Sequence, residues 1–85
     1  MVRLIIKRSA ERDLRRLPRP VFLRLNQSIV SLRDDPHPPG SRKLKGALEG
    51  WRIRVGDYRV IYQIDEESQT VTVVRVRHRR DVYGP

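Results

Sequence analysis

The chain has 85 residues, which suffices for one domain with a single small core and excludes a second domain. It carries 19 lysine and arginine residues against 10 acidic ones, a formal net charge of +9, and has no cysteine, which excludes disulfides and thiolate metal sites. Because most of the charge is carried by arginine, we expect a polyanionic partner: nucleic acid first, an acidic protein second and an anionic membrane surface a distant third.

The first residues form no recognisable targeting segment. The apolar run in "MVRLIIKRS" is too short for a secretory signal or a membrane span, and no small-residue cleavage site follows it. We therefore expect the protein to stay in the cytoplasm.

The first half of the chain predicts a strand followed by two helices. A β-rich run predicts a strand from Val2 to Lys7. Ser9 is expected to cap a first helix that stops at Leu17, because Pro18 follows. Pro20 fits the first turn of a second helix. The apolar residues of that helix recur at helical spacing and form one face: Val21, Leu25, Ile29 and Leu32.

The second half predicts a linker and then three strands. "DDPHPPG", residues 34–40, contains three prolines and a glycine, which favour turn and extended conformations within the domain. The strand-like runs are Trp51 to Val55, Tyr58 to Ile64 and Val71 to Arg77. This order predicts an α+β fold: an N-terminal strand, a two-helix hairpin and an antiparallel three-strand meander that completes a four-stranded sheet with both helices on one face.

Gly56-Asp57, read as a two-residue loop, fixes the register of the first hairpin. Counting outward pairs Val55 with Tyr58, Arg54 with Arg59, and so on to Trp51 with Tyr62. Alternation then assigns these residues to the helix side: Trp51, Ile53, Val55, Tyr58, Val60 and Tyr62. The opposite face receives Arg52, Arg54, Arg59, Ile61 and Gln63.

The polar run Glu66 to Thr70 closes the second hairpin. Taking Asp65 opposite Val71 gives the further pairs Tyr62 with Val74, Val60 with Val76, Ile61 with Arg75, and Arg59 with Arg77. This register predicts a row of three arginines across three strands: Arg54, Arg59 and Arg77. Arg52 and Arg75 should lie next to the row.

An arginine row of this kind is unfavourable by itself. Like charges set directly opposite each other destabilise a sheet by up to about 1 kcal/mol per pair. A phosphate chain bound across the row would relieve this repulsion. The alternative is that this is only the solvated face of an antiparallel sheet, which tolerates arginine through its long apolar stem.

The last residues, "RVRHRRDVYGP", add further candidates for chemistry: His78, Arg79, Arg80 and Tyr83. His37 and His78 lack the spacing of metal ligands, so we expect no metal and no cofactor. Neither a Ser-His-Asp set nor a phosphate-binding glycine loop is present in the sequence. Cleavage of RNA fits these residue types, because the substrate supplies its own nucleophile, the 2′-hydroxyl.

Each candidate has a chemical role and an ordinary alternative. Tyr83 would serve as general base if nearby cations lower its pKa from about 10, or it is an aromatic packed on the sheet. Arg79 or Arg77 would bind the phosphorane oxygens. His78 would protonate the leaving 5′-oxygen, or it is a partly buried strand histidine that alternation points to the helix side.

Three segments together resemble the RelE/ParE toxin superfamily, and within it the RelE branch: "KLKG" at 43–46, "WRIRVGDYRVIY" at 51–62 and "HRRDVY" at 78–83. The resemblance implies a RelE-like α+β fold and a cognate antitoxin with an acidic segment that wraps the toxin in a hetero-oligomer. It also implies cleavage of messenger RNA in the A site of the 70S ribosome, which inhibits translation.

The resemblance also indicates site residues. It implies catalytic roles for Arg59, Arg79 and Tyr83, with Arg77 in place of Arg79 if the last segment is aligned without a gap. We add His78 as the candidate proton donor. The expected RNA- and phosphate-binding residues are Arg52, Arg54, Arg77, Arg75, Lys43 and Lys45.

Arg52 and Arg54 depart from the branch, in which well-studied members carry lysines at these positions. Arginine, with a pKa above about 12, is a poor proton donor at neutral pH. Arg54 is therefore assigned to phosphate binding, and proton donation is left to His78 or to solvent.

Two other functions stay open on the sequence. One is a ParE-like inhibitor that binds DNA gyrase and performs no chemistry. The other is a protein without activity that serves as a partner-binding or DNA-binding module. Alternating arginines and a terminal tyrosine favour the nuclease, because a gyrase binder has no need of them.

Overall fold

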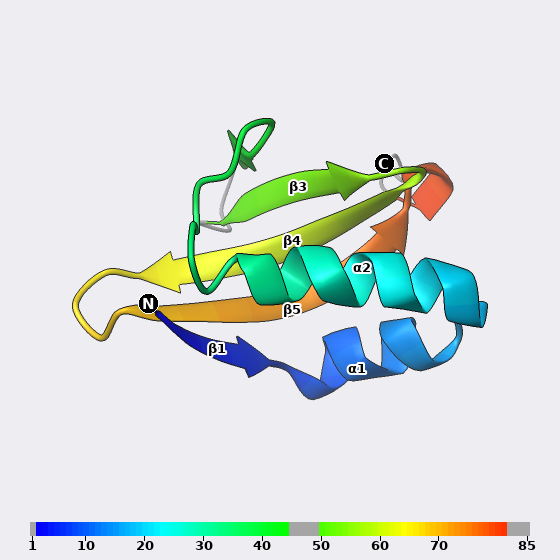
Figure 1. Cartoon of the computed structure of the whole chain (residues 1–85), viewed down its shortest axis with the longest axis horizontal. Helices are drawn as coiled ribbons and strands as arrows, with labels where there is room; N and C mark the ends of the chain where they lie inside the picture. Colours follow the sequence, from blue (N-terminus) through cyan, green and yellow to red (C-terminus); the bar gives the residue numbers. More distant parts are fainter. Residues whose placement is uncertain (1, 45–49, 82–85) are drawn as a thin grey trace.

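The computed structural model describes residues 2–44 and 50–81, which form a five-stranded sheet with two helices packed against one face (Figure 1). In chain order the elements are β1 (Arg3–Ile6), α1 (Arg8–Arg15), α2 (Arg19–Ser31), β2 (Arg42–Lys43), β3 (Trp51–Val55), β4 (Tyr58–Asp65), β5 (Thr70–His78) and a short 3₁₀ helix, η1 (Arg79–Asp81). The strand order is β1-β5-β4-β3-β2. The α+β class is confirmed, but the predicted strand count was one too low, because β2 was missed.

The sheet is mixed, since β1 pairs with β5 in parallel, with Leu4 beside Val71. The predicted antiparallel meander of β3, β4 and β5 is confirmed, and β1 completes the sheet on its parallel side. Chain direction explains the parallel pair: α2 runs back along α1, and β3, β4 and β5 then reverse direction in turn (Figure 1). The number of reversals between β1 and β5 is even, so the two strands run the same way.

Pro18 and Pro20 lie at the junction of the two helices, as predicted, but the cap and the end of α1 need correction. Ser9 does not cap α1: the cap position is Lys7, and the Ser9 hydroxyl donates instead to the Val74 carbonyl at 2.6 Å. The helix ends at Arg15 rather than Leu17. Pro20 lies in the first turn of α2, as predicted. Within the described residues, no helix combines the length and the apolar composition needed to cross a membrane.

A single core lies between the helices and the sheet. Leu25 and Ile29 of α2 and its C-cap residue Leu32 are fully buried, as their spacing predicted, and Val21 is half-buried beside them. The sheet contributes the buried residues Ile53, Val60, Tyr62, Val71, Val73 and Val76, and α1 contributes Ala10 and Leu14. Burying each Leu or Ile side chain stabilises the fold by roughly 1.5–3 kcal/mol.

The first hairpin has the predicted register at every pair, from Val55 with Tyr58 to Trp51 with Tyr62. The second has it only from Tyr58 to Ile61, because a bulge follows. Ile61 pairs with Arg75 but Tyr62 pairs with Val73, so the predicted Tyr62–Val74 pair is wrong.

The bulge lies at the point along β5 where β1, its neighbour on the side away from β4, ends. β1 ends at Ile6, opposite Val73, and α1 then takes over the β5 edge through the Ser9 hydroxyl. The extra residue on β5 shifts every later pair by one, so Asp65 pairs with Thr70 instead of Val71.

Candidate nucleic-acid interface

The predicted arginine row is present on the face opposite the helices. Arg54 of β3 pairs with Arg59 of β4, and Arg59 pairs with Arg77 of β5. Arg54 is exposed and Arg77 half-buried, but Arg59 between them is only 8% exposed. The centre of the row is thus a charge held in a largely desolvated position, where electrostatic interactions are stronger than in water.

A second row of paired residues lies beside the first and begins on β2, a strand that was not predicted from the sequence. Arg42 of β2 pairs with Arg52 of β3, followed by Ile61 and Arg75. The places of Arg52 and Arg75 next to the first row were predicted. Arg42 was not, because no turn signal in the sequence sets the register between β2 and β3.

Lys43 does not join these rows in the structure. Lys43 pairs with Trp51, whose side chain belongs to the helix face, so Lys43 lies on the face opposite the arginines. The structure therefore does not bring Lys43 together with the expected phosphate-binding residues. Lys45 lies outside the described residues.

Arg75 is engaged within the fold rather than directed to the open face. Its Nε donates to Asp13 Oδ2 at 2.9 Å and its Nη2 to Asp13 Oδ1 at 3.2 Å. Asp13 Oδ2 also accepts the Val76 backbone N–H at 2.9 Å. This bidentate hydrogen bond to the Asp13 carboxylate gives Arg75 a structural role. We therefore do not include Arg75 among the proposed phosphate ligands.

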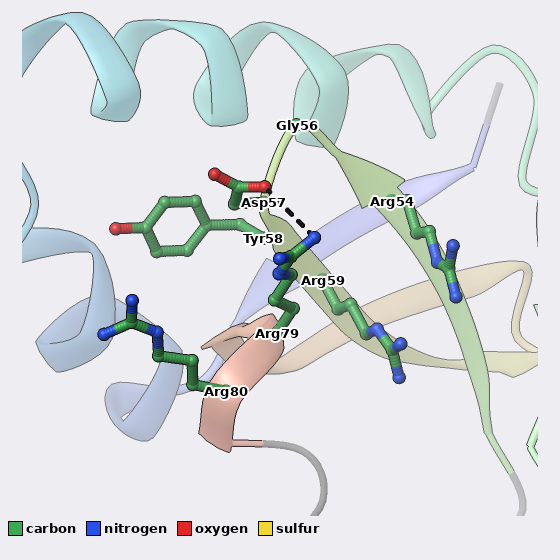
Figure 2. A pocket seen from close by; sticks show the side chains of 7 residues that line it. All are labelled: Arg54, Gly56, Asp57, Tyr58, Arg59, Arg79 and Arg80. Atoms are coloured by element: carbon green, nitrogen blue, oxygen red, sulfur yellow. Dashed lines mark ion pairs between the residues drawn. The ribbon is translucent and has the colours of Figure 1, made fainter.

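A pocket of about 380 Å³ opens at the end of the first row (Figure 2). Its lining residues are Arg54, Gly56, Asp57, Tyr58, Arg59, Arg79 and Arg80. Figure 2 shows the Arg54 and Arg59 side chains extending the same way from β3 and β4, whereas the Arg79 side chain extends from η1 toward Asp57 and the Arg80 side chain extends away from Arg54 and Arg59. Four arginines against one carboxylate make the lining strongly positive.

The turn between β3 and β4 holds η1 against this pocket. Gly56 has φ of 61°, as the first central residue of a type II′ turn requires. The Arg79 backbone N–H donates to the Asp57 carbonyl at 2.8 Å, and Arg79 Nη1 lies 3.9 Å from Asp57 Oδ1. Arg79 is thereby fixed beside Arg59, although the two are far apart in sequence.

His78 does not face the arginine row. It pairs with Tyr58, and the two rings meet edge to face with centroids 5.1 Å apart. Its Nδ1 accepts the Arg80 backbone N–H at 3.2 Å. This is the partly buried strand histidine of the alternative interpretation, so the structure does not join His78 to the arginines. Tyr83 lies outside the described residues.

Comparison with known proteins identifies the fold and the family. A family model described as the ParE toxin of the type II toxin-antitoxin system, parDE, matches residues 4–83. The chain belongs to the RelE/ParE superfamily of type II toxins. This toxin is 36% identical over 77 residues to Toxin RelG of Mycobacterium tuberculosis, covering 88% of this chain and 87% of the relative.

Solved structures of related toxins share the fold of this toxin. The RelBE2 toxin-antitoxin complex from Mycobacterium tuberculosis matches with a TM-score of 0.81 and 29% identity, over 91% of this chain and 96% of the other. The archaeal RelE-RelB complex from Pyrococcus horikoshii matches with a TM-score of 0.81 and 28% identity, over 92% and 94%. The predicted RelE-like fold is confirmed.

Proposed function

We propose that this toxin is a metal-independent endoribonuclease that cuts messenger RNA in the A site of the 70S ribosome and so inhibits translation. The observation that carries the proposal is that Arg54, Arg59 and Arg79 line one pocket. Three guanidinium groups around a hollow of this kind suit a phosphate whose negative charge increases in the transition state.

The proposed reaction transfers the phosphate from the 5′-oxygen to the 2′-oxygen of the preceding nucleotide. The 2′-oxygen attacks phosphorus, its proton passes to Tyr83 as general base, and a 2′,3′-cyclic phosphate forms as the 5′-oxygen leaves. Arg59 and Arg79 stabilise the phosphorane oxygens, and Arg54 binds the ground-state phosphate. Since His78 packs on the other face, the leaving oxygen takes its proton from solvent.

We further propose that an antitoxin with an acidic segment neutralises this toxin. Two observations support this: the similar toxins named above were solved as toxin-antitoxin complexes, and this chain has a formal charge of +9. An acidic segment laid over the arginine rows would compete directly with RNA.

Inhibition of DNA gyrase without chemistry is the second candidate, because the matching family model is described as a ParE toxin. The arginines that line the pocket favour the nuclease, since a protein that only binds gyrase gains nothing from placing them there.

The deciding experiment adds the toxin to a translating extract and maps the 5′ ends of the messenger. We expect cuts only on ribosomes, reduced about 100-fold or more in Arg79→Gln, because one phosphorane ligand is lost. Arg15→Gln is the matched control, since the Arg15 side chain is 78% exposed on α1. Intact messenger together with blocked DNA supercoiling would favour the gyrase function instead.

A further inference from the structure

A second hollow, of about 450 Å³, lies at the β2 edge of the arginine face. It is lined by Pro39, Gly40, Arg42, Arg52, Ile53 and Arg54. Among these lining residues three are arginines and none is acidic. We propose that this hollow is a second anion subsite, which binds the RNA phosphodiester next to the one that is cleaved; the inference rests on the proposed nuclease function.

The two hollows share one lining side chain. Arg54 lines both of them, so an RNA strand that runs from the first pocket to the second passes this guanidinium group. Arg52 and Arg54 are alternate residues of β3, which separates their Cα atoms by about 6.7 Å on the same face. That step suits neighbouring phosphates of an extended single strand, which such basic grooves bind along the backbone.

Arg42 and Arg54 differ from Arg75 and Arg79 in their surroundings. Arg75 is bound to Asp13, and Arg79 lies near Asp57. Within residues 2–44 and 50–81, no carboxylate forms an ion pair with Arg42 or Arg54. Arg42 is instead set opposite Arg52, a like-charge pair at an exposed sheet edge that a bound anion would stabilise.

The segment that carries Arg42 is anchored to the core before it reaches the sheet. The hydroxyl of Tyr62, which is fully buried, donates to the Pro36 carbonyl at 2.8 Å. Ser41 then closes a turn by donating its N–H to the Pro38 carbonyl at 2.9 Å. The backbone that leads to Arg42 is thereby anchored before RNA arrives, which lowers the entropic cost of ordering this segment on binding.

Binding of a fluorescent single-stranded 2′-O-methyl RNA hexamer tests the subsite, because the methyl groups block cleavage. For Arg42→Gln we expect several-fold weaker binding at low salt, and a slope of log K against log salt that is smaller by about 0.7, the loss of one phosphate contact. Lys43→Gln is the matched control: it removes the same charge from the same strand, but on the opposite face. Its slope should equal that of the unmodified toxin.

A second measurement identifies which RNA supplies the phosphate. Salt-dependent co-sedimentation with vacant 70S ribosomes reports ribosomal RNA, whereas the hexamer stands for the messenger. A smaller slope for Arg42→Gln with the hexamer supports the subsite, whereas a smaller slope with the vacant ribosomes alone would assign Arg42 to ribosomal RNA and overturn the subsite. Equal slopes for Arg42→Gln and Lys43→Gln with both probes would overturn it.

Arg54→Gln separates failure of the subsite from failure of the proposed function. If Arg54→Gln weakens binding and Arg42→Gln does not, the subsite is wrong and the nuclease proposal stands. If neither variant weakens binding of either probe, both are wrong.

Discussion

Arg59 combines a positive charge with an almost fully buried position. It is 8% exposed and lies between Arg54 and Arg77, at the edge of the proposed cleavage pocket. We expect Arg59→Ala to relieve growth arrest and to reduce cleavage about 100-fold or more, because a preorganised phosphorane ligand is removed. Toxin induction in growing cells and mapping of messenger 5′ ends would measure both effects.

The control for this prediction is antitoxin binding, which should stay measurable in Arg59→Ala if the fold is intact. Arg59→Lys should recover part of the activity, since it restores the charge without the planar fork. Full toxicity of Arg59→Ala would exclude a catalytic role for this residue.

Ionisation of the Tyr62 hydroxyl should lower the free energy of unfolding of this toxin. Burial, the largest cause, and the nearby Asp35 charge raise the pKa of Tyr62, while a hydrogen bond with Ser41 lowers it. Because the folded pKa lies above the unfolded value of about 10, the stabilisation is complete below pH 10 or so and is lost as pH rises through the folded pKa. Urea unfolding at neutral and alkaline pH would measure this loss.

Tyr62→Phe is the matching variant. It should lower the free energy of unfolding at neutral pH by about 1 kcal/mol or more, because the Pro36 carbonyl loses its donor. It should also lose less stability than the unmodified toxin at alkaline pH. An identical alkaline loss in both proteins would contradict the assignment.

At the scale of elements, α1 acts as a cover for the β5 edge beyond the end of β1. Asp13 accepts bonds from Arg75 and from the Val76 N–H, and its side chain is 14% exposed. We expect Asp13→Ala to lower the free energy of unfolding by about 2 kcal/mol, because a backbone donor and a guanidinium lose a charged partner. Urea denaturation at neutral pH is the measurement.

Glu11→Ala is the control on the same helix. Glu11 pairs with Arg15 at 3.8 Å, and both side chains are well exposed. A pair of this kind contributes about 0.5 kcal/mol or less. Equal losses for the two variants would show that α1 does not depend on its contact with β5.

The sequence predicted those elements whose geometry is set by local signals. Gly56-Asp57 fixed the whole β3–β4 register, and the prolines placed the start of α2. β2 and the bulge at Val74 had no such signal, because they depend on contacts between distant segments. For the same reason alternation placed Arg75 next to the row but did not reveal its bond to Asp13.

The residues of the candidate site also divide into those that local signals predicted and those that depend on contacts between distant segments. Arg54, Arg59 and Arg77 follow from pairing geometry alone, whereas the place of Arg79 in the pocket depends on η1 bonding to Asp57. His78 was correctly assigned to the helix side by alternation, which argues against the catalytic role that its chemistry suggested.

At the scale of the whole molecule, charge of opposite sign collects at the two ends of β4. Asp65, Glu66 and Glu67 lie at the β4–β5 turn, whereas the pocket with Arg79 and Arg80 lies at the β3–β4 turn. Such an arrangement orients an approaching polyanion toward the arginine end, and salt screens this steering.

The approach of the proposed antitoxin should therefore depend on salt. Raising the ionic strength from about 0.05 to about 0.5 M should lower the association rate constant at least tenfold, and change the dissociation rate constant less. Stopped-flow mixing of toxin and antitoxin would measure both constants. Arg54→Gln should reduce the salt dependence and Arg15→Gln should leave it nearly unchanged, because only Arg54 belongs to the arginine row. An association rate that does not vary with salt would mean that the antitoxin first contacts another surface of the toxin.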